Sequence, residues 1–192
     1  MIRYEHSLNE RIRTLMRLED VYSRLSVYAE GDLPQDHHAA LASLFEIADI
    51  AARADLKTEL LQELERQRQV LGPLRANPRI ETEALDALLA DIDGVTAQLL
   101  AASGKLGAHL RDNEWLMAIK QRSGIPGGAC EFDLPAYHWW LHRDAEARRA
   151  DLRGWIEPFE PVFAGLAVVL RLLRENGRSG RHIAYRGVFQ LM

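Results

Sequence analysis

Apolar and polar positions alternate with a helical period along most of the chain. Between residues 8 and 29, a rotation of about 100° per residue places the apolar side chains on one broad helix face. These side chains are Leu8, Ile12, Leu15, Leu18, Tyr22 and Leu25. Arg13, Arg17 and Arg24 fall on the opposite face. The pattern therefore predicts an amphipathic helix with three aligned arginines, which we call the arginine stripe.

The same spacing predicts further helices, separated by glycine- and proline-containing turns. They cover residues 36–52, 55–71, 78–102 and 106–122, a short helix capped by Asp133, one opened by Asp144, and a last helix from about 158 to 177. The helix at 55–71 has a long polar face. This face fits either an elongated hairpin arm or an ordinary solvated helix surface.

The two ends of the chain have a different pattern. Residues 182–191 are typical of an extended strand, and residues 2–4 could form a short matching strand. A two-stranded ribbon alone is only marginally stable. We therefore predict a mostly α fold with a helical domain at 8–177, in which residues 1–7 and 178–192 are strands at the edge of an incomplete C-terminal β domain.

Composition and charge narrow the class of protein. The 192 residues are 47% hydrophobic and 27% charged, as in ordinary soluble domains, and the single Cys130 fits a reducing cytoplasm. The first six residues lack the apolar core of a signal peptide, and the longest apolar stretch, 162–170, is too short to cross a bilayer. A net charge of −4 argues against a dedicated nucleic-acid binder. We expect a cytoplasmic protein without a nucleic-acid or membrane partner.

The motifs that could carry chemistry are incomplete. His138 and His142 have the four-residue spacing of a zinc site on a helix, but a third ligand and the protease glutamate are missing. Gly127-Gly128 lacks the lysine and hydroxyl residue of a phosphate loop. Cys130 has two neighbouring carboxylates, which disfavour a reactive thiolate. We therefore expect no catalytic residue, metal, cofactor or small-molecule substrate, with a metal-dependent enzyme at the two histidines as a rival reading.

Arginine is the informative basic residue. Of 24 basic residues only Lys57, Lys105 and Lys120 are lysines. The planar guanidinium recognises carboxylates through two parallel hydrogen bonds, so the arginine stripe could bind an acidic partner. It could equally be a solvated face paired with neighbours such as Asp20, where exposed ion pairs contribute only ~0–1 kcal/mol. The residues alone indicate a helical interaction domain and leave this choice open.

Several segments resemble the ZapD family of bacterial cell-division proteins. They are Glu5-His6-Ser7-Leu8-Asn9-Glu10, Arg13-Thr14, Arg17-Leu18-Glu19, Thr58-Glu59-Leu60-Leu61, Glu63-Leu64, Leu110-Arg111-Asp112, Gln121-Arg122, Ile125-Pro126-Gly127-Gly128, Cys130, Phe132-Asp133-Leu134-Pro135, His138 and Trp140-Leu141-His142. These segments follow the family's order over nearly the whole chain. The match is thus more specific than that of a single short motif.

The resemblance implies a function for this chain. ZapD-like proteins have a helical domain and a β-rich domain, act as dimers, and bind the acidic C-terminal tail of the tubulin-like protein FtsZ. The chain is accordingly expected to be a non-enzymatic homodimer that cross-links FtsZ filaments and promotes Z-ring assembly at mid-cell. Family members continue with further strands where this chain ends at Met192, so their complete fold is α+β.

The resemblance also implies a basic pocket for the FtsZ tail in the helical domain. Arg17 and His138 match the family's pattern, whereas Glu114 stands at another basic position, for which Arg111 or Arg122 could substitute. The expected tail-binding residues are Arg13, Arg17, Arg111, Arg122 and His138. A helical adaptor that binds a different acidic partner through the same stripe is the alternative reading.

Overall fold

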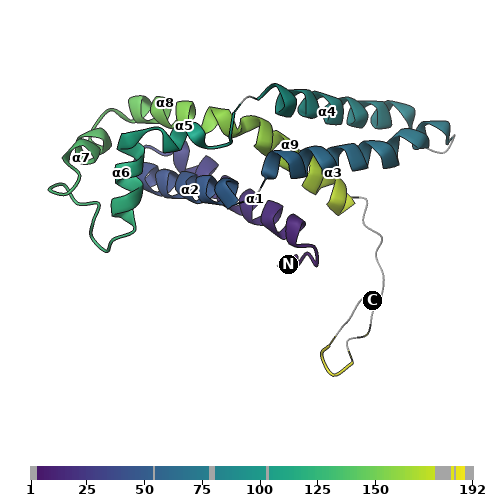
Figure 1. Cartoon of the computed structure of the whole chain (residues 1–192), viewed down its shortest axis with the longest axis horizontal. Helices are drawn as coiled ribbons and strands as arrows, with labels where there is room; N and C mark the ends of the chain where they lie inside the picture. Colours follow the sequence, from purple (N-terminus) through teal and green to yellow (C-terminus); the bar gives the residue numbers. More distant parts are fainter. Residues whose placement is uncertain are drawn as a thin grey trace.

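The computed structural model describes residues 4–53, 55–77, 81–102, 104–175, 183 and 185–188. As predicted, this part of the chain is mostly α (Figure 1). Its elements are α1 (Glu10–Ala29), α2 (Pro34–Arg53), α3 (Leu56–Leu71), η1 (Gly72–Ala76), α4 (Thr82–Ala101), α5 (Ala108–Arg111), α6 (Glu114–Ser123), α7 (Pro135–Leu141), α8 (Ala145–Ile156), η2 (Glu157–Phe159) and α9 (Glu160–Glu175).

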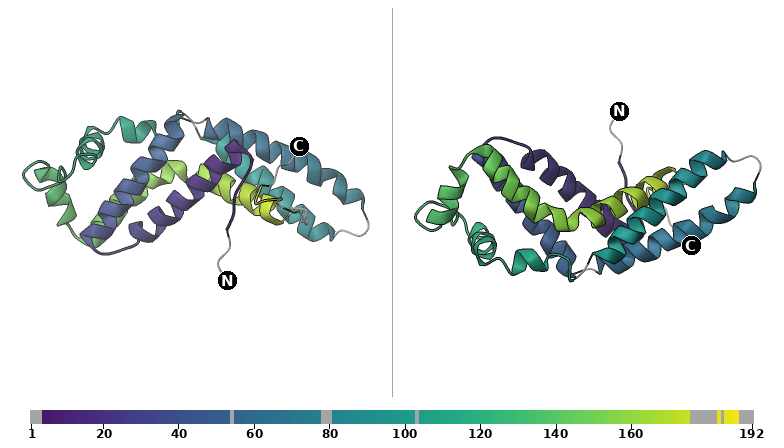
Figure 2. Two further views of the ribbon diagram at one scale, coloured as in Figure 1. Left: turned by 90° about the horizontal axis from the view of Figure 1, so that it is seen from below. Right: turned by 90° about the horizontal axis from the view of Figure 1, so that it is seen from above.

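The helices form a body and an arm. The body consists of α1, α2 and α5 to α8, and the arm is the antiparallel hairpin of α3 and α4 that extends away from it (Figures 1 and 2). α9 belongs to both, because it contacts α1 as well as α3 and α4. Of the two readings of residues 55–71, the structure thus supports the hairpin arm.

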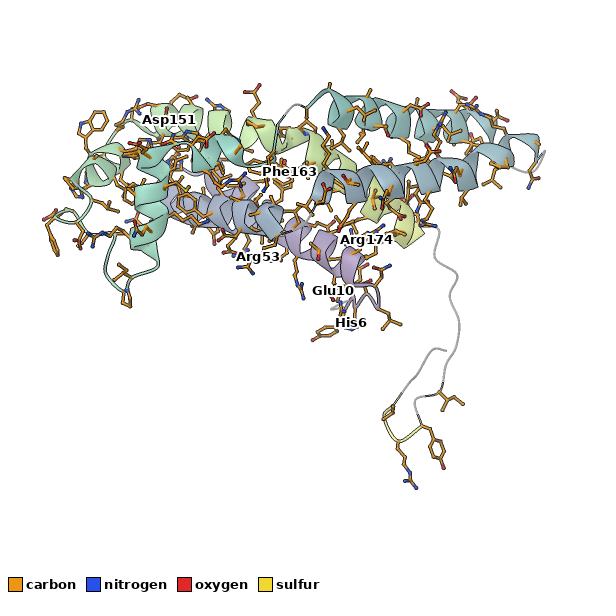
Figure 3. All side chains as sticks on the ribbon, in the orientation of Figure 1. His6, Glu10, Arg53, Asp151, Phe163 and Arg174 are labelled. Atoms are coloured by element: carbon orange, nitrogen blue, oxygen red, sulfur yellow. The ribbon has the colours of Figure 1, made fainter. Side chains whose placement is uncertain are left out.

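Close packing on α9 holds the arm to the body. Phe163 stacks on Tyr22 of α1, with ring centroids 3.6 Å apart, and the labelled Phe163 lies where body and arm meet (Figure 3). Gly165 faces the arm. A Cβ atom there would lie 3.2 Å from Leu99 Cδ1 and 3.5 Å from Leu60 Cδ1. The absence of a side chain at Gly165 therefore sets how closely α3 and α4 approach α9.

A pair of glycine substitutions tests this packing. We expect Gly165→Leu to lower the free energy of unfolding by about 1–3 kcal/mol or more, because the added atoms overpack the interface between arm and α9. Gly94→Ala on α4 is the matched control, since a Cβ there meets nothing within 4 Å. Alanine at this exposed helical position should raise stability by about 0.5–1 kcal/mol. Urea unfolding of both variants measures the difference, and a stable Gly165→Leu protein would contradict the packing argument.

Local capping corrects two predicted helix boundaries. The single helix predicted at 106–122 is wrong, because the chain breaks between α5 and α6, where the side chain of Asn113 accepts a hydrogen bond from the Leu116 N–H (3.1 Å). Asp133 does not cap α7, whose first turn has no side-chain cap; its carboxylate instead accepts from Cys130 Sγ (3.2 Å). The predicted Asp144 cap of α8 is confirmed by its bond to the Glu146 N–H.

Most of the predicted terminal strands lie outside the described residues. Residues 185–188 form a tight turn in which Tyr185 and Val188 make an isolated antiparallel bridge. Arg186 and Gly187 occupy its centre with φ of 54° and 79°. Residues 4–7 are described and are not part of a strand. The boundary between a helical and a β domain stays a prediction.

A buried arginine joins α8 to the start of α2. Arg148 is only 4% exposed. Its guanidinium donates to His37 Nδ1 (2.7 Å) and to the carbonyls of Leu141 (2.7 Å), Arg143 (2.5 Å) and Asp32 (2.6 Å). One cation thereby satisfies four acceptors, which lie on α2, on α7 and in the α1–α2 and α7–α8 loops.

His37 makes this junction sensitive to pH. Its Nε2–H donates to the Gly31 carbonyl (2.7 Å), so the neutral ring presents its Nδ1 lone pair to Arg148. Burial, together with the charges of Arg148 and Arg149, lowers the pKa of His37 below its ordinary value of 6.5, although Asp36 and the Gly31 carbonyl oppose this. The folded protein therefore binds a proton less readily than the unfolded chain.

We expect acidification to cost stability through His37. Its contribution is fully present above pH about 6.5, the unfolded pKa, and is lost as the pH falls below this value toward the lowered folded pKa. In His37→Gln the amide donates and accepts hydrogen bonds but does not titrate. The free energy of unfolding of this variant should therefore fall less on acidification than that of the parent. Urea unfolding of both proteins at pH 7.5 and pH 5.5 gives the comparison. Equal pH slopes for parent and variant would show that His37 does not couple to folding.

Candidate functional site

The arginine stripe lies on α1 beside α2. Arg17 is 65% exposed, and its Nη1 lies 3.4 Å from Glu10 Oε1. Arg24 lies 3.6 Å from Asp20, as the solvated-face reading expected, and also donates to Glu46 of α2 at 2.9 Å. Arg24 thus has a close partner on α2, whereas the one ion pair of Arg17 among the described residues is the 3.4 Å contact with Glu10.

A shallow groove opens beside Arg17. Its volume is about 470 Å³. Its lining combines two arginines of the stripe and two carboxylates with apolar side chains: Arg17, Arg24, Asp20, Glu46, Met16, Val21 and Ile50. Arg13, one turn earlier, pairs with Glu10, and its Nε is buried without a hydrogen-bond partner among the described residues. A peptide in this groove would meet the guanidinium groups of Arg17 and Arg24 together with apolar surface, whereas Arg13 lies outside the lining.

A second basic group lies on α6 and α7. Arg122 is about half exposed, with Nη1 3.5 Å from Asp133 Oδ1, and His138 Nε2 lies 3.7 Å from Glu131 Oε2. The rings of His138 and His142 have centroids 4.3 Å apart. Within the described residues no group of three or more His, Cys, Asp or Glu side chains could hold a metal, so the zinc reading gains no third ligand.

Exposed apolar side chains surround this second group. Phe132 is 83% exposed, Trp139 66% and Ile125 49%. Trp139 lies under the Arg143 guanidinium, 5.5 Å from the ring centroid, whereas the adjacent Trp140 is buried. Phe132 lies in a segment that resembles the ZapD family but was not among the expected binding residues. The only signal for Trp139 was that neighbouring helical residues point about 100° apart.

α2 lies between the two basic groups. Arg24 of α1 pairs with Glu46 of α2, and Lys120 of α6 pairs with Asp49 on the same helix. On the α7 side, His38 hydrogen-bonds the Tyr137 hydroxyl (2.7 Å). The labelled Glu10, which contacts Arg17, lies at the opposite end of the body from α7 (Figure 3).

The structure therefore divides the expected site residues into three sets. Arg13 and Arg17 lie on α1 and both contact Glu10, whereas Arg122 lies near the end of α6 and His138 lies on α7. Arg111 belongs to neither set, because its Nη2 donates to the Leu106 carbonyl (3.2 Å) and its Nη1 is buried. Glu114 stands in the first turn of α6. Only an extended ligand that crosses α2 could contact both exposed sets.

These features describe a helical protein whose body exposes arginine and aromatic side chains. None of the helices in the described segments combines the length and the apolar character needed to span a membrane. Paired arginines, exposed aromatic side chains and a shallow groove are typical of peptide recognition rather than of an enclosed catalytic cleft.

Comparisons with known proteins identify the family. The family model ZapD, described as a cell division protein, matches residues 16–192. The cell division protein ZapD of Aromatoleum aromaticum is 55% identical over 191 residues, which are 100% of this chain and 75% of the relative. Those of Janthinobacterium sp. (strain Marseille) and Dechloromonas aromatica are each 54% identical, covering 100% of this chain and 76% of their own length. The chain belongs to the ZapD family of cell division proteins.

Proposed function

We propose that this chain binds the acidic C-terminal tail of FtsZ in the cytoplasm and, as a homodimer, cross-links FtsZ filaments to promote Z-ring assembly at mid-cell. It acts by binding alone, without a catalytic residue, metal or cofactor. Membership of a cell division family and the two basic groups on either side of α2 support this proposal.

The state of Arg17 is the observation that carries the proposal. Its side chain is 65% exposed, and the described residues offer it one ion pair, a 3.4 Å contact with an exposed Glu10. Such exposed pairs contribute only ~0–1 kcal/mol, so a partner's carboxylate can replace Glu10 at little cost. A bidentate Arg–carboxylate pair is the stronger interaction, because both N–H groups align with both oxygens.

The rest of the surface fits the course of an extended tail. Across α2, the carboxylates of Glu46 and Asp49 are already paired with Arg24 and Lys120, which limits their repulsion of an acidic chain. Beyond α2, His138, Phe132 and Trp139 offer exposed rings for an apolar tail residue. Arg13 on α1 and Arg122 on α6 add positive charge on the two sides of α2.

Affinity per site should be modest and sensitive to salt. Ordering a disordered tail costs about 2–5 kcal/mol of the gross interaction energy. The ion pairs lie at the surface, where ions screen them over a Debye length of about 8–10 Å. A dimer with two such sites compensates through effective concentration and thereby bridges neighbouring filaments.

Co-sedimentation with polymerised FtsZ tests the proposal. The protein is mixed with FtsZ with and without its C-terminal tail, at low and high salt. We expect FtsZ bundles to pellet only when the tail is present, and the amount of pelleted FtsZ to decrease as the salt concentration rises. Bundling that persists without the tail would contradict tail binding. Failure to pellet with either FtsZ would favour the alternative, an adaptor that uses the same arginines for a different acidic partner.

A further inference from the structure

A groove of about 700 Å³ runs between α1 and α8, which lie side by side in the body (Figure 2). Its floor is apolar, because Leu25, Ala29 and Ile156 of the lining are buried. Gly154 belongs to the α8 wall, and a Cβ atom there would meet nothing within 4 Å. The missing side chain therefore leaves this wall open, and the groove presents an apolar surface that the described residues do not fill.

Three glutamates line this groove, and each is exposed without an ion pair among the described residues. They are Glu30, Glu157 and Glu160. Within the described lining the only cation is Arg153, which already pairs with Glu146 at 2.7 Å. The groove therefore carries negative charge that the described structure leaves unpaired, and we call it the acidic groove.

The glutamates lie at both ends of the acidic groove. α1 and α8 run in opposite directions, because the start of α8 is hydrogen-bonded to the loop that follows α1. Glu30 directly follows α1 at one end, whereas Glu157 directly follows α8 at the other. Glu160 begins α9, whose Phe163 stacks on Tyr22 at that same end. The lining of α1 runs from Tyr22 to Glu30, so at 1.5 Å per helical residue the two negative ends lie about 12 Å apart.

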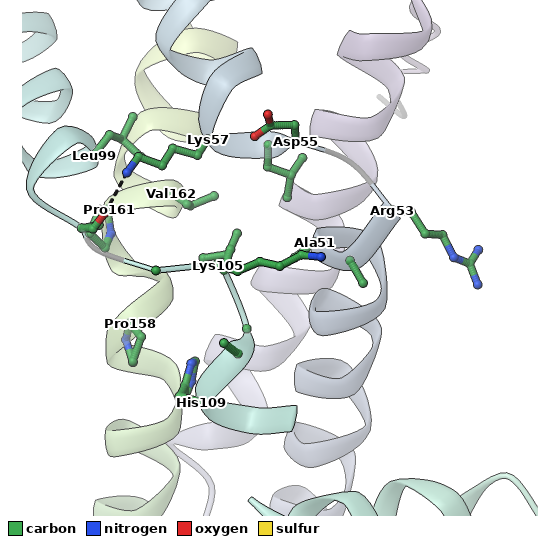
Figure 4. A pocket seen from close by; sticks show the side chains of 17 residues that line it. Ala51, Arg53, Asp55, Lys57, Leu99, Lys105, His109, Pro158, Pro161 and Val162 are labelled. Atoms are coloured by element: carbon green, nitrogen blue, oxygen red, sulfur yellow. Dashed lines mark hydrogen bonds between the residues drawn. The ribbon is translucent and has the colours of Figure 1, made fainter. Parts of the chain in front are cut away.

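The cavity at the joint of arm and body does not combine its features in this way. Lys57 Nζ donates to the Ala102 carbonyl (2.7 Å), whereas Lys105 extends to the opposite side of that cavity (Figure 4). Its two ammonium groups therefore do not face one ligand. In the acidic groove, by contrast, like charges stand at the two ends of one apolar floor.

The acidic groove lies on the opposite side of α1 from the arginine stripe. Tyr22 of the lining comes nine positions after Arg13, and Ser26 comes nine positions after Arg17. Nine positions at about 100° each are about two and a half turns, so each pair points to opposite sides of the helix. α1 thus presents positive charge to one side and negative charge to the other, and a ligand in the groove leaves the stripe free.

We propose that the acidic groove binds a basic segment of a partner protein, in which an apolar side chain lies between two lysines or arginines. The apolar side chain packs on the buried floor, while the cations reach Glu30 at one end and Glu157 and Glu160 at the other. Their aliphatic stems lie along the apolar walls. A distance of about 12 Å corresponds to about four residues of extended chain, which sets the spacing of the two basic residues.

Charge and access distinguish this partner from other ligands. The acidic tail proposed for the arginine stripe is repelled here by three unpaired carboxylates. Ser26 of α1 and Ala150 of α8 lie on opposite walls and are exposed, so the groove is open to solvent and admits a chain that continues beyond its ends. The protein therefore takes an acidic and a basic partner on opposite sides of α1.

Fluorescence anisotropy with a dye-labelled peptide, Lys-Ala-Leu-Ala-Lys, tests the chemistry of the partner. In an extended chain this peptide has both lysines and the leucine on one face. We expect a saturable rise in anisotropy with this peptide and none with Glu-Ala-Leu-Ala-Glu at the same ionic strength. Unlabelled spermidine, a cation without side chains, should displace the probe about tenfold less well than unlabelled peptide. Equal displacement would assign the groove to small cations instead, and absence of saturable binding would overturn the proposal altogether.

Four variants locate the binding. Gly154→Leu fills the groove without changing its charge and should weaken binding by about tenfold or more, because the floor can no longer bury the peptide's leucine. Gly94→Leu on α4 is the matched control, since a Cβ there also meets nothing within 4 Å. Glu157→Gln should weaken binding by about two- to fivefold, as expected for one exposed ion pair, whereas the exposed change Glu83→Gln on α4 should bind like the parent. Equal affinities within either pair of folded variants would overturn the assignment to this groove.

Discussion

An Arg148→Met protein should lose about 3–5 kcal/mol of its free energy of unfolding, because the four hydrogen bonds that one buried cation donates disappear together. Methionine fills similar space but donates no hydrogen bond. His37 and the carbonyls of Leu141, Arg143 and Asp32 then lose the donors that satisfy them. Buried acceptors left without donors cost ~1–3 kcal/mol each. Because a domain is stable by only ~5–15 kcal/mol, this loss is a large share of the total.

Arg153→Met is the matched control for Arg148→Met. Arg153 lies on the same helix, α8, but is half exposed and pairs with Glu146 at 2.7 Å. Exposed pairs of this kind contribute ~0–1 kcal/mol, so the control should unfold near the parent's midpoint. Urea unfolding followed by circular dichroism measures both variants. Similar midpoints for the two would show that the buried network does not hold α8 to the start of α2.

The helices could largely be predicted because burial follows their apolar period. α1 and α4 begin and end within a few residues of the predicted limits. The apolar residues that the period places on the inner face of each helix, such as Leu15 and Leu18 of α1 and Leu89 and Ile92 of α4, are buried. The period cannot reveal a short interruption. The Asn113 side chain accepts a hydrogen bond from the Leu116 N–H and so begins a new helix, α6. Apolar spacing does not report such a local hydrogen bond.

Tertiary contacts decided what the sequence left open. Arg148 and Arg153 belong to one arginine-rich helix, and only the approach of α2 determines that Arg148 is the buried one. For the expected binding residues, the helical period placed Arg13 and Arg17 on one face correctly. It could not show that Arg111 turns toward its own loop, or that α2 separates Arg17 from His138, because both depend on how distant helices pack.

Replacing Arg17 with Glu should abolish FtsZ bundling while leaving the protein folded. The change removes a charge-assisted hydrogen bond worth ~1.5–3 kcal/mol and adds repulsion of the acidic tail, so affinity per site should fall by more than about tenfold. Both sites of a dimer are lost together, which multiplies the effect on cross-linking. Folding should change little, because Arg17 is 65% exposed and has one weak ion pair within the described structure.

Arg75→Glu separates a local effect of Arg17 from one of net charge. Arg75 lies in η1 at the far end of the arm and is likewise exposed, with a 2.7 Å ion pair to Asp86. Both variants shift the net charge equally. If FtsZ bundles pellet with the Arg75→Glu protein but not with the Arg17→Glu protein, the tail binds at the α1 surface. Arg17→Lys should bundle weakly, because lysine keeps the charge without the planar fork. Normal bundling by a folded Arg17→Glu protein would remove Arg17 from the binding surface and leave α6 and α7 as the remaining basic group for the tail.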